Sequence, residues 1–133
     1  MKHFALICMT LLAVSGCKKD ETVAGYDGGK TWSLIELDGQ AFDARATLVF
    51  GDDGKITGQA PCNNYFATQT EPYPWINISA IGSTRMACPE LEKETQFFTA
   101  LEDMTLAEVT GDVLLLSNDA GREMAFTPVK DAD

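Results

Sequence analysis

The apolar residues between positions 31 and 129 occur in short runs that are separated by turn-forming residues. Ala46–Phe50 and Lys55–Gln59 flank the sequence Gly-Asp-Asp-Gly, whose Asp-Gly step supplies the positive φ of a tight hairpin at little cost. Similar runs occur at residues 32–37, 75–81, 106–109, 113–116 and 123–129. These short runs predict about seven strands in a mainly antiparallel sheet that is strongly curved or nearly closed.

One segment departs from the strand pattern and predicts a helix from Pro89 to about Met104. Proline suits the first helical position, and the glutamates that follow it suit the positive end of a helix. The large apolar side chains fall on one side, at Leu91, Phe97, Phe98, Leu101 and Met104. The expected fold class is therefore α+β, a curved and mainly antiparallel sheet with one helix packed on it.

The first seventeen residues resemble a bacterial lipoprotein signal. Lys2 and His3 precede an apolar run, Phe4–Ala13, which is interrupted only by Thr10 and is followed by the small residues before Cys17. The run is shorter than the ~20 apolar residues that span a membrane. We expect residues 1–16 to be removed and Cys17 to be lipidated. The alternative is an ordinary secretory signal with an incidental cysteine.

The domain boundaries follow from this reading. Residues 17–30 are polar and contain glycine, so we expect a lipidated cysteine followed by a flexible tether. The folded domain is expected over residues 31–129, and residues 130–133 are expected to form a frayed tail. Several acyl chains would hold the domain durably at a membrane, because a single chain binds only marginally. Lys18, rather than Asp, follows the cysteine, and in a Gram-negative bacterium lipoprotein sorting rules then favour the outer membrane, facing the periplasm.

Removal of residues 1–16 would take away Lys2 and His3, leaving 9 basic against 20 acidic groups and a formal charge of −11. Such a chain is repelled by nucleic acid and by anionic lipid head groups. It would also lack histidine, which excludes Ser–His and Cys–His nucleophile pairs and imidazole-ligated metals. We expect a monomer with no cofactor, no metal and no nucleic-acid partner, whose contacts are the membrane and an envelope protein.

Two cysteines remain when Cys8 and Cys17 are set aside, namely Cys62 and Cys88. An oxidising compartment and an even count favour a disulfide between them. Closing a loop of about 26 residues is worth roughly 3.5 kcal/mol in the chain-entropy estimate. Two alternatives stay open, which are two free thiols and a reactive cysteine whose pKa is lowered by the start of the helix.

Several motifs together resemble the META domain family, which includes HslJ-like heat-shock lipoproteins. The resemblance covers residues 30–129 and rests on Trp32-Ser33-Leu34, Asp38-Gly39, Leu48-Val49-Phe50, Asp53-Gly54, Cys62-Asn63, Tyr65-Phe66 and Thr84-Arg85-Met86-Ala87-Cys88. Family members usually place glycine before the first cysteine and often arginine after the asparagine. This chain has Pro61 and Asn64 at those positions.

The resemblance implies a small envelope or secreted domain linked to heat shock, antibiotic tolerance, motility or virulence, without an established enzymatic activity. The candidate motif residues are Asn63, Thr84, Arg85 and Met86. We interpret Arg85 as a residue that fixes the loop before the helix, by bonding to backbone carbonyls or pairing with an acidic side chain. The preferred hypothesis is a membrane-anchored, non-catalytic envelope protein that serves stress tolerance by binding a partner or supporting envelope proteins.

Two other functions remain as alternatives. The first is a small ligand-binding or inhibitor module that uses the concave side of the sheet, lined by Tyr65, Tyr73 or Trp75. The second is a thiol-based redox protein that acts through Cys62 or Cys88. A packed interior without a cleft would argue against the first, and a disulfide between the two cysteines would argue against the second.

Overall fold

The computed structural model describes residues 20–27 and 29–130. These residues form nine strands, a 13-residue helix, one short helical turn and one 3₁₀ turn. The helix is α2, Leu91–Asp103, and the turns are α1, Ala24–Asp27, and η1, Asp52–Gly54. The strands are β1 Thr31–Leu37, β2 Gln40–Ala41, β3 Thr47–Phe50, β4 Lys55–Gln59, β5 Asn64–Thr68, β6 Ser79–Ser83, β7 Leu106–Thr110, β8 Val113–Ser117 and β9 Glu123–Pro128.

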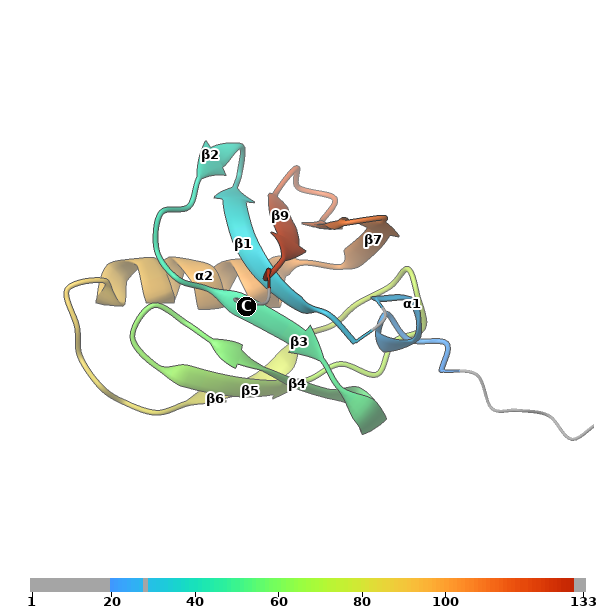
Figure 1. Ribbon diagram of the computed structural model, residues 1–133, viewed down its shortest axis with the longest axis horizontal. Helices are drawn as coiled ribbons and strands as arrows, with labels where there is room; N and C mark the ends of the chain where they lie inside the picture. The colour runs from blue at the N-terminus through green and yellow to red at the C-terminus, as the bar shows by residue number, and fades with distance from the viewer. Residues whose placement is uncertain (1–19, 28, 131–133) are drawn as a thin grey trace, which may run out of the picture.

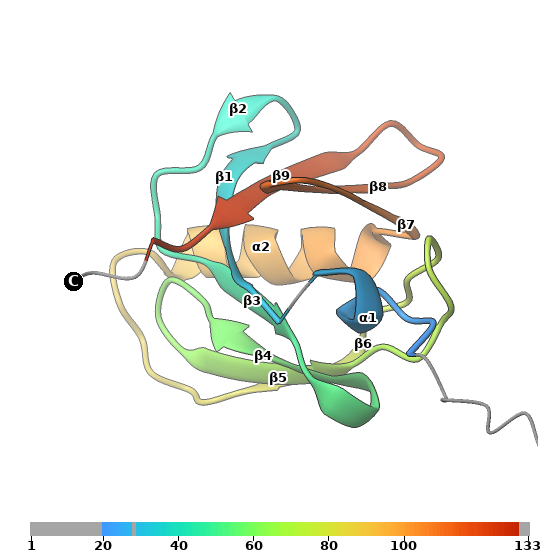
Figure 2. The same ribbon diagram turned by 45° about the vertical axis from the view of Figure 1, so that its right-hand side comes forward.

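The strands make one antiparallel sheet in the order β6-β5-β4-β3-β1-β9-β8-β7, and β2 folds back on β1. The sheet curves around α2, with β9, β8 and β7 on one side of the helix and β3, β4 and β5 on the other (Figures 1 and 2). The fold is therefore α+β, as predicted, but the sheet is open. An isolated bridge pairs Trp75, in the loop between β5 and β6, with Leu106 of β7.

The core lies between the concave side of the sheet and α2. Phe97 of the helix is fully buried and packs edge-on against Tyr65, with ring centroids 5.5 Å apart. Fully burying one large apolar side chain contributes about 1.5–3 kcal/mol. The strands supply alternate residues to this core, namely Trp32, Leu34, Leu48, Phe50, Ile56, Tyr65, Ala67, Ala107, Leu114, Leu116, Met124 and Phe126. The concave side is consequently filled by side chains.

Part of the expected tether is packed on the domain. Val23 is a core residue with no exposed surface, and it directly precedes the turn α1, where its carbonyl accepts the N–H groups of Tyr26 and Asp27. The ring of Tyr26 stacks on that of Tyr73 at 4.3 Å, and the backbone N–H of Tyr73 donates to the carbonyl of Glu21 at 2.7 Å. The packed part of the chain thus begins well before residue 31. The proposed signal, Cys17 and residues 131–133 of the tail lie outside the described residues.

The strand predicted over residues 75–81 is wrong in extent, because β6 covers only Ser79–Ser83. The side chain of Gln69 is buried and accepts the backbone N–H of Asn77 at 2.7 Å, while the N–H of Ile76 donates to Thr105 at 3.0 Å. These two bonds hold residues 76 and 77 away from β5, so they do not join its ladder. The strand β5 itself was not predicted. None of the helices in the described part of the chain is long and apolar enough to cross a membrane.

Candidate functional site

Three of the predicted motif residues, Asn63, Thr84 and Met86, meet in one hydrogen-bond network. Asn63 is 5 % exposed, and its amide nitrogen donates to Glu94 Oε2 at 2.8 Å and to the carbonyl of Met86 at 3.0 Å. Its amide oxygen accepts from Thr84 Oγ1 at 2.9 Å and from the N–H of Met86 at 2.7 Å. Both donors and both lone pairs of the amide are used, so Asn63 holds the loop before α2 in one geometry.

Glu94 completes this network, which we call the Asn63 network (Asn63, Thr84, Met86 and Glu94). The sequence pattern places this glutamate only among those near the positive end of the helix, and the structure shows that Glu94 is buried, with 4 % of its surface exposed. Its Oε1 accepts the backbone N–H groups of Cys62 at 3.1 Å and Asn63 at 2.8 Å. A buried carboxylate is tolerated when several donors satisfy it. Here three donated hydrogen bonds offset the cost of burying the charge.

A disulfide between Cys62 and Cys88 lies beside the Asn63 network. It joins the loop before β5 to the segment that leads into α2, with the two Cα atoms 5.6 Å apart. The covalent bond and the network therefore fasten the same two loops. In this state neither of the two sulfurs is available as a nucleophile.

Arg85 does not fix the loop, so the interpretation made from the sequence is wrong. Its side chain is exposed and makes no hydrogen bond or ion pair with any other residue in the described ranges. The loop is instead held through Asn63 and the backbone of Met86. Arg85 lies at a shallow hollow of about 380 Å³ that is also lined by Leu91 and Phe98.

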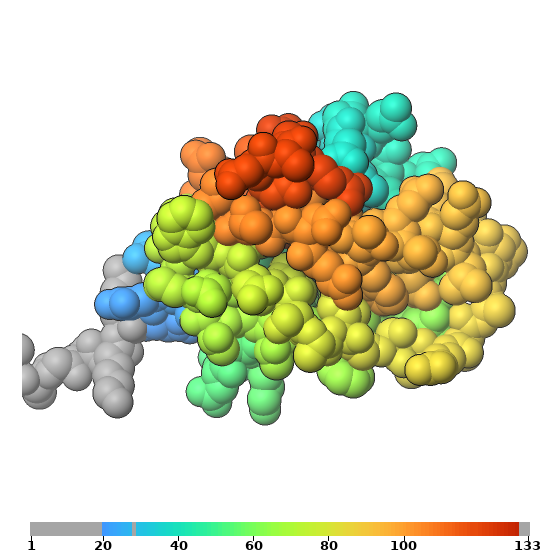
Figure 3. Space-filling view, turned by 180° about the vertical axis from the view of Figure 1, so that it is seen from behind, coloured from blue at the N-terminus to red at the C-terminus, as the bar shows by residue number. Residues whose placement is uncertain are grey.

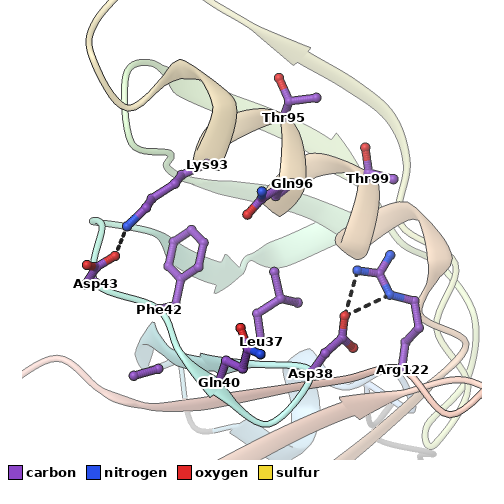
Figure 4. Close-up of a pocket in the computed structure, with 11 residues that line it drawn as sticks. Leu37, Asp38, Gln40, Phe42, Asp43, Lys93, Thr95, Gln96, Thr99 and Arg122 are labelled. Atoms are coloured by element: carbon purple, nitrogen blue, oxygen red, sulfur yellow. Dashed lines mark hydrogen bonds and ion pairs between the residues drawn. The ribbon is translucent and has the colours of Figure 1, made fainter.

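A larger hollow lies between α2 and the hairpin of β1 and β2, and we call it the helix–hairpin groove. It has a volume of about 670 Å³. Figure 4 shows Leu37 and Phe42 on the hairpin side, facing Gln96 and Thr99 on the helix. The groove thus combines apolar side chains with amide and hydroxyl groups. The full lining is Leu37, Asp38, Gln40, Ala41, Phe42, Asp43, Lys93, Thr95, Gln96, Thr99 and Arg122.

Both cations of the groove are paired with carboxylates. Lys93 contacts Asp43 at one end, and Arg122 contacts Asp38 at the other (Figure 4). Arg122 donates to Asp38 Oδ2 from Nη2 at 3.0 Å and from Nε at 3.3 Å, and to Asp103 at 2.8 Å. These bonds raise the pKa of Arg122, and its guanidinium lowers the pKa of Asp38. The groove is therefore close to electrically balanced.

The aromatic residues predicted to line a concave binding site do not share one. Tyr65 is a core residue whose hydroxyl donates to the carbonyl of Thr47 at 2.5 Å, and burial raises the pKa of that hydroxyl. Tyr73 is half-buried, whereas Trp75 faces solvent. The groove was missed because its residues come from separate segments without a common motif. In the described part of the chain, no three His, Cys, Asp or Glu side chains gather as metal ligands do.

The sequence matches the META domain family over residues 24–131. The chain belongs to the META domain family. A comparison with curated protein sequences gives no match.

Two solved structures resemble this META domain. A DUF4847 family protein from Bacteroides vulgatus superposes with a TM-score of 0.65 at 16 % identity, over 78 % of this chain and 95 % of that one. A protein from Burkholderia xenovorans superposes with a TM-score of 0.62 at 22 % identity, over 77 % of this chain and 83 % of that one. At these identities the likeness concerns the fold alone.

Proposed function

We propose that this META-domain protein is a lipid-anchored protein of the bacterial cell envelope that binds a partner polypeptide, without catalysis, and supports tolerance of heat and envelope-active drugs. The observation that carries the binding role is the helix–hairpin groove of about 670 Å³. Its size lies within the range of sites that hold a small ligand or a few residues of a peptide.

The lining of the groove favours a neutral, extended segment. Leu37 and Phe42 offer apolar surface to a side chain, and Gln96 and Thr99 offer hydrogen-bonding groups to a peptide backbone. Gln96 and Thr99 make no hydrogen bond through their side chains with other residues in the described ranges. The two cations of the groove, Lys93 and Arg122, are already paired with carboxylates. A strongly charged ligand would therefore have to break one of these ion pairs before it could bind.

The anchor is supported by the leader, in which an apolar run ends on small residues at Cys17. Lys18 after the cysteine supports the outer membrane, facing the periplasm, as its location. A non-catalytic role is supported by the absence of histidine after His3 and by the disulfide between Cys62 and Cys88. Together these features leave the described domain without the usual Ser–His or Cys–His pair.

The anchor is tested by labelling cells with a fatty acid probe and comparing wild type with Cys17→Ser. We expect label and membrane association in the wild type and neither in the variant. An unlabelled wild-type protein would refute the anchor.

The binding role is tested by complementing a deletion strain with groove variants. Thr99→Trp fills the groove from the helix, and Glu102→Trp places the same side chain on an exposed part of α2 outside it. We expect Thr99→Trp to lose tolerance of heat and envelope-active drugs and Glu102→Trp to keep it. A photo-crosslinking residue at position 96 should capture a polypeptide that one at position 102 does not. Full tolerance with Thr99→Trp, together with equal crosslinking at both positions, would refute the groove as the binding site.

A further inference from the structure

Two large aromatic side chains are exposed at the end of the domain where the described chain begins. Trp75 is 55 % exposed and Tyr26 is 45 % exposed. We propose that Trp75 and Tyr26 form a membrane-contact surface that rests in the head-group region of the leaflet holding the lipid anchor. This inference rests on the lipidation of Cys17 that is proposed above.

The packing of residues 20–27 on the loop at residues 69–78 places Tyr26 and Trp75 at the same end of the domain. Tyr26 stacks on Tyr73, and the N–H of Tyr73 bonds to Glu21 at 2.7 Å. Trp75 is only two residues further along this loop, and its N–H donates to Pro72 at 2.8 Å. Figures 1 and 2 show α1 beside the loop, and the space-filling view shows the two segments adjoining at one end of the molecule (Figure 3).

The chain between the anchor and this surface is short. Asp20 is three residues from Cys17, and three residues span at most about 11 Å even when fully extended. The head-group layer on each side of a bilayer is itself roughly 5–8 Å thick. A domain held on so short a connection stays against the membrane, and the end that carries residue 20 is the end that faces it. Tryptophan and tyrosine are the side chains that favour this interface.

The loop that carries Trp75 is held rigidly. The buried side chain of Gln69 donates to the carbonyl of Glu71 at 2.8 Å and accepts the N–H of Asn77 at 2.7 Å. The carbonyl of Pro74 accepts the N–H of Ala107 at 2.7 Å, so the loop is also bonded to β7. An exposed aromatic side chain on a preorganised loop loses little conformational entropy when it enters an interface.

The charges near this surface determine which lipids it suits. Asp20, Glu21 and Glu71 are exposed at the same end, and the hydroxyl of Thr22 lowers the pKa of Asp20, which keeps that carboxylate charged. Carboxylates are repelled by anionic head groups. In the sequence, Lys18 and Lys19 lie between the anchor and these carboxylates, so the net charge near the surface is small. The contact therefore depends on the aromatic side chains, and the favoured surface is one of zwitterionic head groups.

The two tryptophans of the chain allow a direct test, because Trp32 is fully buried and Trp75 is exposed. The acylated full-length protein is placed in zwitterionic phosphatidylethanolamine–phosphatidylcholine vesicles that contain lipids brominated near the head group. The emission of Trp75 is obtained by subtracting the fluorescence spectrum of Trp75→Phe, which keeps only Trp32, from that of the wild type. We expect vesicles to quench most of this emission and to shift its maximum to shorter wavelength, while the remaining Trp32 emission is unchanged.

A matched control carries a reporter at the other end of the domain. Met86 is exposed on the loop between β6 and α2, which lies away from α1 in Figure 1. The variant Met86→Trp/Trp75→Phe should show no quenching by the same vesicles. Equal quenching at the two positions, or no quenching of Trp75 in acylated protein, would overturn the membrane-contact surface and leave the anchor intact. A native protein whose mass shows no acyl chains would overturn the anchor and this inference with it.

Discussion

The substitution Asn63→Asp places a second carboxyl group in the Asn63 network with almost no change in shape. The new carboxyl would replace an amide nitrogen that lies 2.8 Å from Glu94 Oε2 and 3.0 Å from the carbonyl of Met86. Two buried carboxylates at such a separation do not both stay charged, so one of them takes up a proton when the variant folds. The stability of the variant should therefore depend on pH in a way that the wild type does not share.

The size of the effect follows from the cost of that proton. Keeping a carboxyl group with an ordinary pKa of about 4 protonated at pH 7 costs roughly 4 kcal/mol, since each pKa unit is worth about 1.4 kcal/mol. The proton can bridge the two carboxyls, but the bond to the carbonyl of Met86 is lost, which costs about 1 kcal/mol more. We expect a loss of about 5 kcal/mol at pH 7, a large part of the stability of about 5–15 kcal/mol that is typical of a domain.

The direction of the pH dependence is fixed by the pKa of the carboxyl pair. That pKa is raised in the folded variant, so the folded chain binds more protons than the unfolded chain above the unfolded pKa of about 4. The loss in free energy of unfolding relative to the wild type should therefore grow as the pH rises from about 4 to 7. It should shrink toward about 1 kcal/mol as the pH is lowered again to about 4.

Urea unfolding followed by circular dichroism measures the free energy of unfolding of the wild type and of Asn63→Asp, once at pH 7 and once near pH 4. The loss is the difference between the two proteins at the same pH. Asn64→Asp adds the same charge at an exposed neighbouring position and should stay within about 0.5 kcal/mol of the wild type. The reasoning is refuted if Asn63→Asp is as stable as Asn64→Asp at pH 7, or if its loss relative to the wild type does not change with pH.

Two further predictions concern other parts of the domain. Arg122→Gln removes the guanidinium that lowers the pKa of Asp38, so an NMR titration should find this pKa closer to the ordinary value of about 3.9, and an unchanged titration would contradict the pairing. Gly58→Ala would bring a Cβ within 2.2 Å of the backbone oxygen of Thr47, so we expect a loss of about 1–3 kcal/mol in urea unfolding. In Gly82→Ala the new Cβ would meet the ring of Phe66, which is exposed and can move aside, so this variant should lose less stability than Gly58→Ala. Equal losses of stability in the two variants would contradict this prediction.

The sequence predicts local structure well where a turn and its strands lie together in the chain. The hairpin of β3 and β4 was expected from its Asp-Gly step, and the structure pairs Val49 with Thr57. The strand β5 was missed because Tyr65, Phe66 and Ala67 form a continuous apolar run, although Phe66 faces solvent. An exposed aromatic residue conceals the alternation that marks a half-buried strand.

The candidate sites depend on contacts between distant segments, and sequence patterns describe these poorly. Resemblance to the family drew attention to Asn63, Thr84 and Met86, which the structure brings together. Glu94 has the local pattern of an exposed helical residue, and its burial follows only from the approach of the loop before β5. The helix–hairpin groove likewise arises from the way the hairpin leans over α2.

The burial of Val23 couples the N-terminal end of the chain to the interior of the domain. A pulling force applied at that end would first load the turn α1 and the bond between Glu21 and Tyr73. Beyond this bond the load would pass to β1, which lies in the middle of the sheet between β3 and β9. Mechanical tension at the point of attachment is thus borne by the centre of the fold, and detaching residues 20–27 would open a hole in its core.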